Sequence, residues 1–432
     1  MKPIFAASIT LSIATSLAVA TSPSREGTSS SRLLRSGNGS NASEGRNPLP
    51  HACAPSGVPL QTPIVSGLNV AGFSSQEFSS CLSNMLHGTM ATYIPHKMVT
   101  EPLIRTYKRS STPPTLVGPP QTSFLIELID GQHALPLQPS VQSMAEAMGL
   151  PIFTHNATAY SFKDSVESVK SLVFYRTDLF SEYNLTVPTT LEAFEDLISA
   201  ISDLEAAKPF CLSIYSGNAT GWVGTDWTEN YILAKHGAPT IEDWVHKEYV
   251  NDEYVADAND WVKEHVIAHS DSERNCEAWT TQIEDLQDGR CFMTLTLSSR
   301  YFEAGANEDD LIAWFEFPGT DQQLIVGNSY TIAFTNEYLS SAEKGDRKKQ
   351  VNAYYNLSLT SEGASMKMVD GSAKRGEVSL VPGVSVAQSG VPLFKEFATL
   401  VRNATLVYDP TDRMQNYEDH WKYWKDELCP TA

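Results

Sequence analysis

The stretch KPFCLSIYSGNATGWVGTDW, residues Lys208 to Trp227, combines aromatic side chains, small residues and one carboxylate in a short span. The residues of interest are Tyr215, Gly221, Trp222, Asp226 and Trp227. Turns that glycines permit can present flat aromatic faces and a carboxylate to one cavity. An indole covers the C–H face of a pyranose, and a carboxylate accepts hydrogen bonds from sugar hydroxyls. The stretch therefore indicates a saccharide-binding loop, with ordinary core packing as the alternative interpretation.

The order of these residues resembles the alpha-glucoside-binding members of the extracellular solute-binding proteins that serve bacterial ABC sugar importers. In that family a Pro-Trp-Cys strand leads into Ser-Gly-x-x-Thr-Gly-Trp and then into Thr-Asp-Trp. The matching positions are Pro209 to Cys211, Ser216 to Trp222 and Thr225 to Trp227, with Glu229 just beyond. Residues 169–197 are similar to the hinge strand and Val-Pro-x-Thr turn of the family, and residues 112–138 to its proline-rich ligand loop.

The resemblance implies an α/β protein with a two-lobed, periplasmic-binding-protein-like (type II) fold, a central cleft and hinge crossovers. We expect the first lobe to hold residues 59–168 and 322–360, and the second to hold residues 169–321 and 361–432. A length of 432 residues suits two lobes better than one compact core. The ligand would lie between the lobes, and hinge closure would bury it.

The resemblance also implies which side chains contact the ligand. The candidates are Gln121, Lys170, Gly221, Trp222, Asp226, Trp227 and Asn328. Trp222 and Trp227 are the stacking candidates, and we expect at least one of them to lie in the core instead. Asn328 follows Val326-Gly327 where the family has Gly-Gly-Asp, so this position donates as well as accepts and carries no charge.

From about Pro59, short apolar runs alternate with helical patterns, which is typical of an α/β protein. We expect helical structure at residues 125–128 and 143–148, from an N-cap at Thr190 to about 204, at 226–236, and from 361 onward. Extended segments are expected at residues 151–153, 171–175 and 324–334. The last of these should be one strand that returns to the first lobe.

The N-terminus has the pattern of a secreted protein. Residues Met1 to Ala20 predict a signal peptide that is cleaved after about Ala20, so we expect an extracellular location. Residues 21–58 are rich in Ser, Gly and Arg and are expected to be a disordered leader. Within them Arg32, Leu33, Leu34 and Arg35 resemble the Arg-x-Leu-Arg (RxLR) motif of oomycete secreted effectors. A chance match and a processing site are the alternatives.

The six cysteines and the Asn-x-Ser/Thr sequons fit secretion. An even cysteine number after a signal peptide favours disulfides over zinc, among Cys53, Cys81, Cys211, Cys276, Cys291 and Cys429. Six cysteines allow 15 pairings. Our preferred one joins Cys211 to Cys276 or Cys291, which the resemblance places in one lobe. Candidate glycosylation sites are Asn156, Asn184, Asn218, Asn356 and Asn403, with two more at Asn38 and Asn41 in the leader.

The net charge and the spacing of the acidic residues argue against two classes of function. A formal net charge of −20 argues against nucleic-acid binding, which needs a basic face. Asp226 and Glu229 lie at i, i+3 of one helix, whereas a glycosidase pair flanks its bond about 5–10 Å apart, so catalysis is not expected. Their simpler role is to favour the N-terminus of the helix.

The sequence therefore predicts a secreted, monomeric binding protein for an alpha-glucoside or similar small saccharide, with no enzyme activity and no cofactor or metal. A membrane transporter or a host protein is the expected downstream partner. The main alternative is a secreted effector or sequestering protein that reuses this fold, and a less favoured alternative is a glycoside hydrolase. A glycan at Asn218 would obstruct the ligand loop, so under the favoured prediction that sequon stays unmodified.

Overall fold

The computed structural model describes residues 67–68, 92–93, 108–109, 113–119, 121–166, 168–204, 206–247, 252–305, 311–328, 330–369, 376–384 and 392–430. The chain divides into two units, residues 1–48 and 49–432, and the described residues belong to the second. Several predicted features lie outside the described residues: the signal peptide, the leader motif at Arg32 to Arg35, Cys53, Cys81 and the sequons at Asn38 and Asn41.

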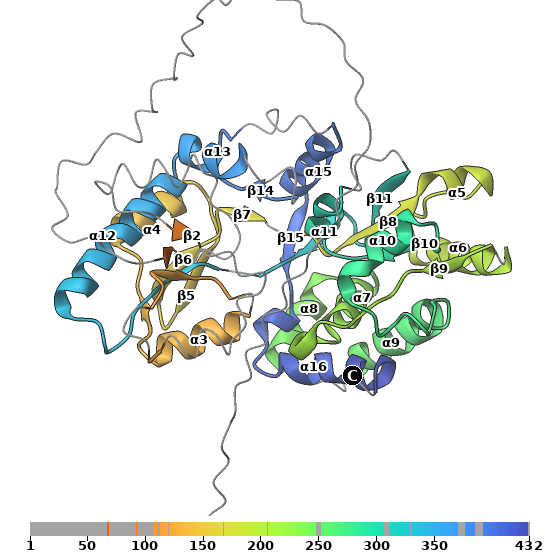
Figure 1. Ribbon diagram of the computed structural model, residues 1–432, viewed down its shortest axis with the longest axis horizontal. Coiled ribbons are helices and arrows are strands. Elements are labelled where there is room, and N and C mark those ends of the chain that lie inside the picture. The colour runs from red at the N-terminus through yellow and green to blue at the C-terminus, as the bar shows by residue number, and fades with distance from the viewer. Residues whose placement is uncertain are drawn as a thin grey trace, which may run out of the picture. The chain divides into compact units, whose positions relative to one another are not determined.

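One group of elements surrounds a small antiparallel sheet, on the left of Figure 1. Its strand order is β3-β13-β4, with a neighbouring hairpin of β5 and β6. The strands are β3 (Leu116–Val117), β4 (Ala134–Leu135), β5 (Ile152–His155), β6 (Thr158–Phe162) and β13 (Ile332–Phe334). The helices are α3 (Thr122–Asp130), α4 (Pro139–Ala147), α12 (Ser341–Ser358) and α13 (Ser361–Val369). Apolar side chains from this sheet, α4 and α12 form one buried cluster that includes Leu116, Val141 and Tyr355. A further short pair joins β1 (Gly67–Leu68) to β2 (Thr92–Tyr93).

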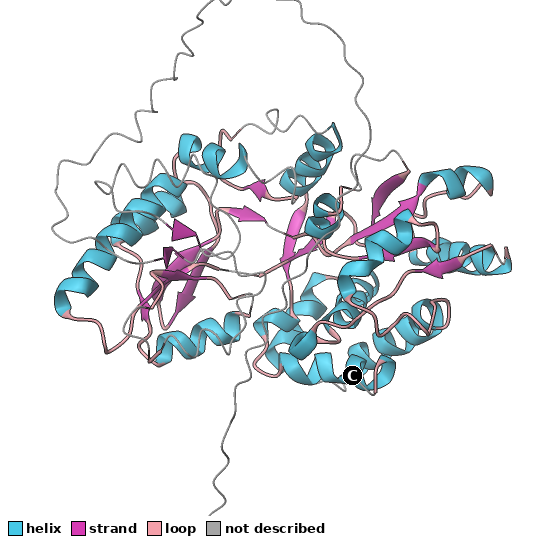
Figure 2. Cartoon of the chain, in the orientation of Figure 1, coloured by secondary structure: helices cyan, strands magenta, loops and turns pink. Residues whose placement is uncertain are grey.

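The other group, on the right of Figure 1, is built on a four-stranded mixed sheet of order β11-β8-β10-β9. Its strands are β8 (Leu172–Arg176), β9 (Lys208–Phe210), β10 (Cys291–Leu295) and β11 (Ile312–Glu316). The β-branched and aromatic residues of β8 suit its central position, where both neighbours pair with it antiparallel. Figure 2 shows helices alongside these strands. They are α5 (Thr177–Glu182), α6 (Leu191–Asp203), α7 (Trp222–His236), α8 (Ala238–Lys247), α9 (Glu253–Val262), α10 (Gln282–Gln287), α11 (Ser298–Glu303) and α16 (Tyr417–Leu428).

Several short elements complete the described chain. Two further strand pairs are β12 (Gln323–Val326) with β15 (Thr405–Tyr408), parallel, and β7 (Ser165–Val166) with β14 (Val378–Ser379), antiparallel. The remaining helical segments are η2 (Gly217–Ala219), η3 (Lys263–Ile267), η4 (Trp279–Thr281), η6 (Thr411–Arg413) and α15 (Pro392–Asn403).

Most of the predicted elements are confirmed, and one strand is corrected. The Thr190 hydroxyl accepts a hydrogen bond from the Ala193 amide at 3.2 Å and so caps α6 as expected. The single strand predicted for residues 324–334 is instead two strands, β12 and β13, in different sheets. The chain leaves β12 at Gly327, whose amide donates to the Ser168 carbonyl, so the apolar run does not continue in one ladder.

Helix α7 begins at Trp222, earlier than the predicted start at Asp226. Gly221 ends the preceding turn with φ 109°, a left-handed conformation that glycine adopts without steric cost. Asp226 and Glu229 therefore lie beyond the first turn of the helix, which corrects the expected role of these acids at its N-terminus. Both side chains are buried. They need partners from other elements, because burying an unpaired charge is costly.

Two disulfides are present among the described cysteines. Cys211 pairs with Cys291, which confirms one of the two preferred partners and staples the end of β9 to β10. Cys276 pairs with Cys429 and fixes the end of α16 across a sequence separation of 153 residues.

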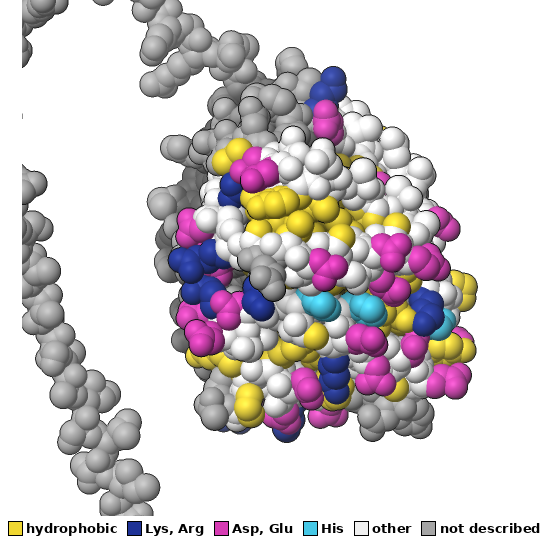
Figure 3. Space-filling model, turned by 90° about the vertical axis from the view of Figure 1, so that its right-hand side faces the viewer, with side chains coloured by type: hydrophobic (Ala, Val, Ile, Leu, Met, Phe, Trp, Pro, Cys, Tyr) yellow, Lys and Arg dark blue, Asp and Glu magenta, His cyan; other side chains and the backbone are white. Residues whose placement is uncertain are grey.

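The described surface mixes charged, polar and hydrophobic side chains. On the face in Figure 3, lysine and arginine side chains are interspersed with acidic ones, and hydrophobic side chains gather between them. The sequon residues Asn156, Asn184, Asn218, Asn356 and Asn403 are all exposed. In the described part of the chain, none of the helices combines the length and the apolar character that a membrane crossing requires.

Candidate ligand-binding site

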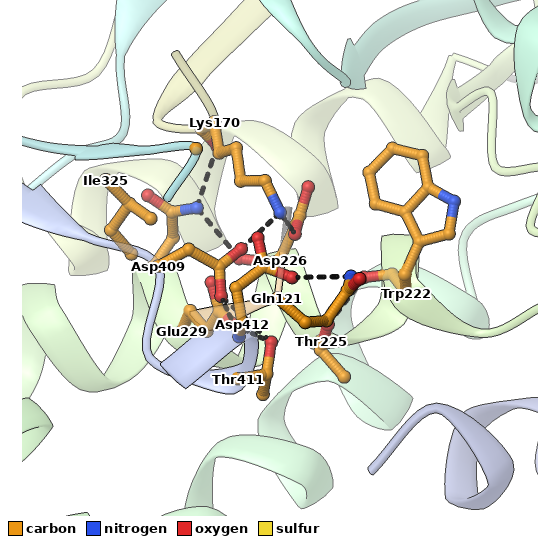
Figure 4. Close-up of polar contacts among 12 residues, drawn as sticks. Gln121, Lys170, Trp222, Thr225, Asp226, Glu229, Ile325, Asp409, Thr411 and Asp412 are labelled. Carbon is orange, nitrogen blue, oxygen red and sulfur yellow. Dashed lines mark hydrogen bonds and ion pairs between the residues drawn. The ribbon is translucent and has the colours of Figure 1, made fainter. Parts of the chain in front are cut away.

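The site centres on Lys170, which lies just before β8 and is only 8% exposed. Its amide donates to the Ile325 carbonyl at 2.8 Å, so β12 fixes the position of its backbone. Its ammonium donates to Asp226 Oδ1 at 3.0 Å and to the carboxylate of Asp409 (Figure 4). The same nitrogen lies 5.3 Å from the centre of the Trp222 ring, in cation–π geometry.

Two segments far apart in sequence supply the acids around Lys170. Asp226 and Glu229 project from the same face of α7, and Asp409 and Asp412 follow β15. One oxygen from each of Asp226, Glu229 and Asp409 lies within 4.8 Å of the others. The Thr411 hydroxyl lies 2.6 Å from Glu229 Oε1 and 3.0 Å from Asp409 Oδ1. All of these side chains are buried. Four carboxyl groups therefore surround one ammonium group in a place that water does not reach.

Burial and mutual charge set the protonation of this cluster. Burial alone would lower the pKa of Lys170, but the Asp226 and Asp409 carboxylates raise it above its usual range. Burial acts to raise the pKa of Asp409, but Lys170 and hydrogen bonds from Thr411 and the Asp412 amide hold it below its usual value. The stable charged pair of the cluster is therefore Lys170 with Asp409.

The other three acids titrate differently. Burial raises the pKa of Asp226 to about 7, against the opposing effect of Lys170. Burial, together with the Asp409 charge, raises the pKa values of Glu229 and Asp412 well above their usual ranges. A carboxyl group that keeps its proton can donate to an oxygen as well as accept, which widens the ligand groups that the cluster can meet.

A third set of polar groups reaches the cluster from the start of α3. Gln121 Nε2 donates to Asp412 Oδ1 at 3.1 Å, and the Thr122 hydroxyl donates to the Asp412 carbonyl at 3.1 Å. Asn328 Nδ2 in turn donates to Thr122 Oγ1 at 2.6 Å. These contacts connect the three-stranded-sheet group to the segment that carries Asp409 and Asp412.

The aromatic candidates separate into one at the cluster and one in the core. Trp222 is partly buried, with its ring 5.1 Å from that of Trp279 in an edge-to-face contact. Trp227 is 1% exposed and packs edge-on against Phe210 at 5.1 Å, as expected for one of the two tryptophans. Gly221 has a packing role, since a Cβ there would lie 2.0 Å from the Trp421 carbonyl oxygen.

The structure thus brings together Lys170, Asp226 and Trp222, with Gln121 and Asn328 linked to them through Asp412 and Thr122. Three residues of the site are not predicted from the sequence: Asp409, Thr411 and Asp412. Their only local signal is the Tyr-Asp-Pro-Thr-Asp-Arg turn at residues 408–413, because the contact with Lys170 depends on the pairing of β15 with β12.

The carboxyl groups of the cluster are closely spaced. The three closest carboxyl groups lie within 4.8 Å of one another around a shared lysine, whereas a glycosidase holds its pair about 5–10 Å apart across the bond. Carboxylate oxygens of Asp226, Glu229 and Asp409 are also suitable ligands for a hard cation. The Lys170 ammonium already supplies a positive charge to Asp226 and Asp409.

Comparisons with known proteins agree with this architecture. Residues 105–336 match the family model described as "Bacterial extracellular solute-binding protein". The alpha-glucosides-binding periplasmic protein AglE of Rhizobium meliloti is 38% identical over 89 residues, covering 21% of this chain and 19% of that protein. The osmoprotective compounds-binding protein GgtB of Synechocystis is 43% identical over 94 residues, 22% of each chain. The matched stretches thus span about a fifth of the length of these relatives.

Solved structures show the same fold at low sequence identity. A chitin oligosaccharide binding protein has a TM-score of 0.60 at 15% identity, covering 83% of this chain and 95% of its own. A Streptococcus pneumoniae solute-binding protein in complex with the blood group A-trisaccharide has a TM-score of 0.62 at 13% identity, covering 83% and 90%. These likenesses establish the two-lobed α/β architecture.

Proposed function

The chain belongs to the bacterial extracellular solute-binding protein family, and from that premise we propose that it binds a small saccharide of the alpha-glucoside type without converting it. The observation that carries the proposal is the convergence of Lys170, Asp226 and the Trp222 ring in one buried site. Sugars are recognised by a combination of charge-assisted hydrogen bonds and a flat aromatic face.

Each residue has a distinct part in the proposed complex. The Trp222 ring covers an apolar face of one pyranose, and Asp226 accepts from a hydroxyl. Lys170 donates to a sugar oxygen. Gln121 and Asn328 contribute amide donors from the other lobe, which makes closure depend on the ligand. Gly221 shapes the turn before α7, and Trp227 supports that helix from the core.

The glucoside class rests on the ligand-loop resemblance and on the name of the AglE relative, which is an alpha-glucosides-binding protein. The lobes expected from the sequence are residues 59–168 with 322–360, and 169–321 with 361–432. We propose this division with one change: α13 belongs to the first lobe, because Ala364 lies in the same buried cluster as Leu116 and Val141. The three-stranded sheet β3-β13-β4 and the four-stranded sheet β11-β8-β10-β9 are separate, and this supports such a division. We propose that the protein works as a monomer outside the cell, as the extracellular family suggests, and delivers its ligand to a transporter or a host partner.

The first test is a thermal-unfolding panel with maltose, trehalose, sucrose and isomaltose on the secreted protein. A ligand at 100 times its Kd stabilises the folded state by about 2.7 kcal/mol, which raises the Tm measurably. One sugar should raise the Tm selectively. If no sugar shifts the Tm, even after enzymatic deglycosylation that clears Asn218, the saccharide proposal is wrong and the search moves to protein partners.

The second test assigns the site. Trp222→Ala should weaken binding of that sugar by roughly 1–3 kcal/mol, or about 5- to 150-fold, through the loss of one stacked and buried ring. Tyr338→Ala is the matched control, because Tyr338 is 55% exposed and takes no part in the cluster. Isothermal titration that gives equal affinities for wild type and Trp222→Ala would place the sugar elsewhere.

A further inference from the structure

The polar side chains assigned to the sugar are already satisfied by the protein itself. Gln121, Lys170, Asp226 and Asn328 are each less than a tenth exposed. Lys170 donates to the Asp409 carboxylate, and Gln121 donates to Asp412 Oδ1 at 3.1 Å. A sugar oxygen that reaches either donor therefore competes with a carboxyl group of this chain.

The competing carboxyl groups belong to one short segment, residues Asp409 to Asp412, which we call the acidic turn. Its carboxylates and its Asp412 carbonyl accept hydrogen bonds from Lys170, Gln121 and Thr122, as sugar oxygens would. Its Thr411 hydroxyl lies 2.6 Å from Glu229 Oε1, in hydrogen-bond contact as a sugar hydroxyl would be. The other oxygen of Glu229, Oε2, is buried without a hydrogen-bond partner in the described structure.

The acidic turn is held at both of its ends. On one side it follows β15, which pairs in parallel with β12 from Gln323 to Val326. On the other side it leads into α16, which packs against α7 and ends at the Cys276–Cys429 disulfide. The turn therefore stays next to the site, and its side chains can release and regain their partners without a large movement of the backbone.

We propose that the acidic turn is a built-in competitor for the sugar, which holds α3 against the second lobe when no sugar is bound. The proposal rests on the saccharide function above and adds its regulation. Closure normally depends on contacts that the ligand provides, but here Asp412 provides them to Gln121 and Thr122. The open, sugar-accepting state is then a minority, and the apparent Kd is weakened by the fraction of molecules in that state.

The deciding experiment compares sugar affinity in wild type, Asp412→Ala and Asp412→Asn. The loss of the hydrogen-bond acceptor for Gln121 should tighten binding by roughly 2- to 10-fold in Asp412→Ala, with a smaller gain in Asp412→Asn. Asp412→Asn keeps the size of the side chain and guards against misfolding. Asp419→Ala is the matched control, since Asp419 is an exposed acid on α16. Weaker or unchanged binding in both Asp412 variants would overturn the competitor role.

A second measurement tests the effect of the acidic turn on the distance between the lobes when no sugar is present. Nitroxide labels on Ser143→Cys in α4 and Ala200→Cys in α6, both exposed positions, report the distance between the two groups of elements. Asp412→Ala should shift the distance distribution toward longer distances, while Asp419→Ala should not. If Asp412→Ala shifts the distances but no variant binds a sugar, the result would support the contact between the acidic turn and α3 and would refute the saccharide function. If the distance distribution does not change, the acidic turn does not hold α3 against the second lobe, whatever the sugar affinities are.

Discussion

At the scale of single residues, the site is defined by an imbalance of charge. Four buried carboxyl groups share the neighbourhood of one lysine, and only Asp409 has a lowered pKa. The resemblance led to Lys170 and Asp226, because both lie in the densely matched part of the chain. It did not lead to Asp409 or Asp412, because no local pattern relates position 170 to position 409.

The raised pKa of Glu229 predicts a pH-dependent contribution to stability. In the folded state this carboxyl keeps its proton above its ordinary pKa of 4.5, whereas in the unfolded chain it releases the proton there. The folded state then binds more protons, so the contribution of Glu229 to the free energy of unfolding decreases as the pH rises above about 4.5. Glu229→Gln keeps the shape without titrating. Its stability relative to wild type should therefore be higher at pH 8 than at pH 5.

Urea unfolding of the two proteins at both pH values measures this difference. Comparison within each pH is needed because other groups act in the opposite direction. Burial lowers the pKa of His420 to about 4, which stabilises the folded state as the pH rises toward 6.5. His420 is present in both proteins, so its contribution cancels. A stability difference that is the same at pH 5 and pH 8 would show that Glu229 titrates normally in the folded state.

At the scale of elements, local sequence patterns predicted most helices. They did not predict the ends of those elements whose limits are set by tertiary packing. The start of α7 is set by Gly221, where α16 approaches closely, and not by the acidic residues that suggested a later start. The apolar run at residues 324–334 is divided because β12 pairs with β15, a strand about eighty residues later, while β13 joins a different sheet. Such pairings are properties of the fold, and single-segment propensities do not contain them.

The contact between α7 and α16 predicts a specific cost at Gly224. A Cβ at this position would lie 2.3 Å from Trp424 Cγ, so the buried indole would have to move. Gly224→Ala should lower the free energy of unfolding by roughly 1–3 kcal/mol. Gly345→Ala in α12 is the matched control, because a Cβ there meets nothing within 4 Å. It should stabilise by about 0.5–1 kcal/mol through helix propensity. Urea midpoints that move in the same direction for both variants would contradict this packing argument.

At the scale of the whole molecule, the two-lobed architecture and the family were predictable because the ligand-loop motif is dense and ordered. The C-terminal segment was not, although it supplies two of the four buried acids around Lys170 and a helix that covers α7. The reason is physical: the segment holds its place through a parallel strand pair, a helix interface and one disulfide, each of which joins it to residues far away in sequence.

That arrangement predicts that the Cys276–Cys429 disulfide supports the site as well as the fold. It closes a loop across 153 residues, and removing it with Cys276→Ser and Cys429→Ser together should cost roughly 2–5 kcal/mol of stability. The loss should be accompanied by faster amide hydrogen exchange in Tyr417–Leu428, because α16 loses its fixed end. The matched control removes Cys211 and Cys291, which join strands that are already hydrogen-bonded to each other. That control should lower stability without selectively exposing α16. Equal exchange in α16 in both double variants would mean that packing of Trp424 alone holds the helix, and that the disulfide contributes only to global stability.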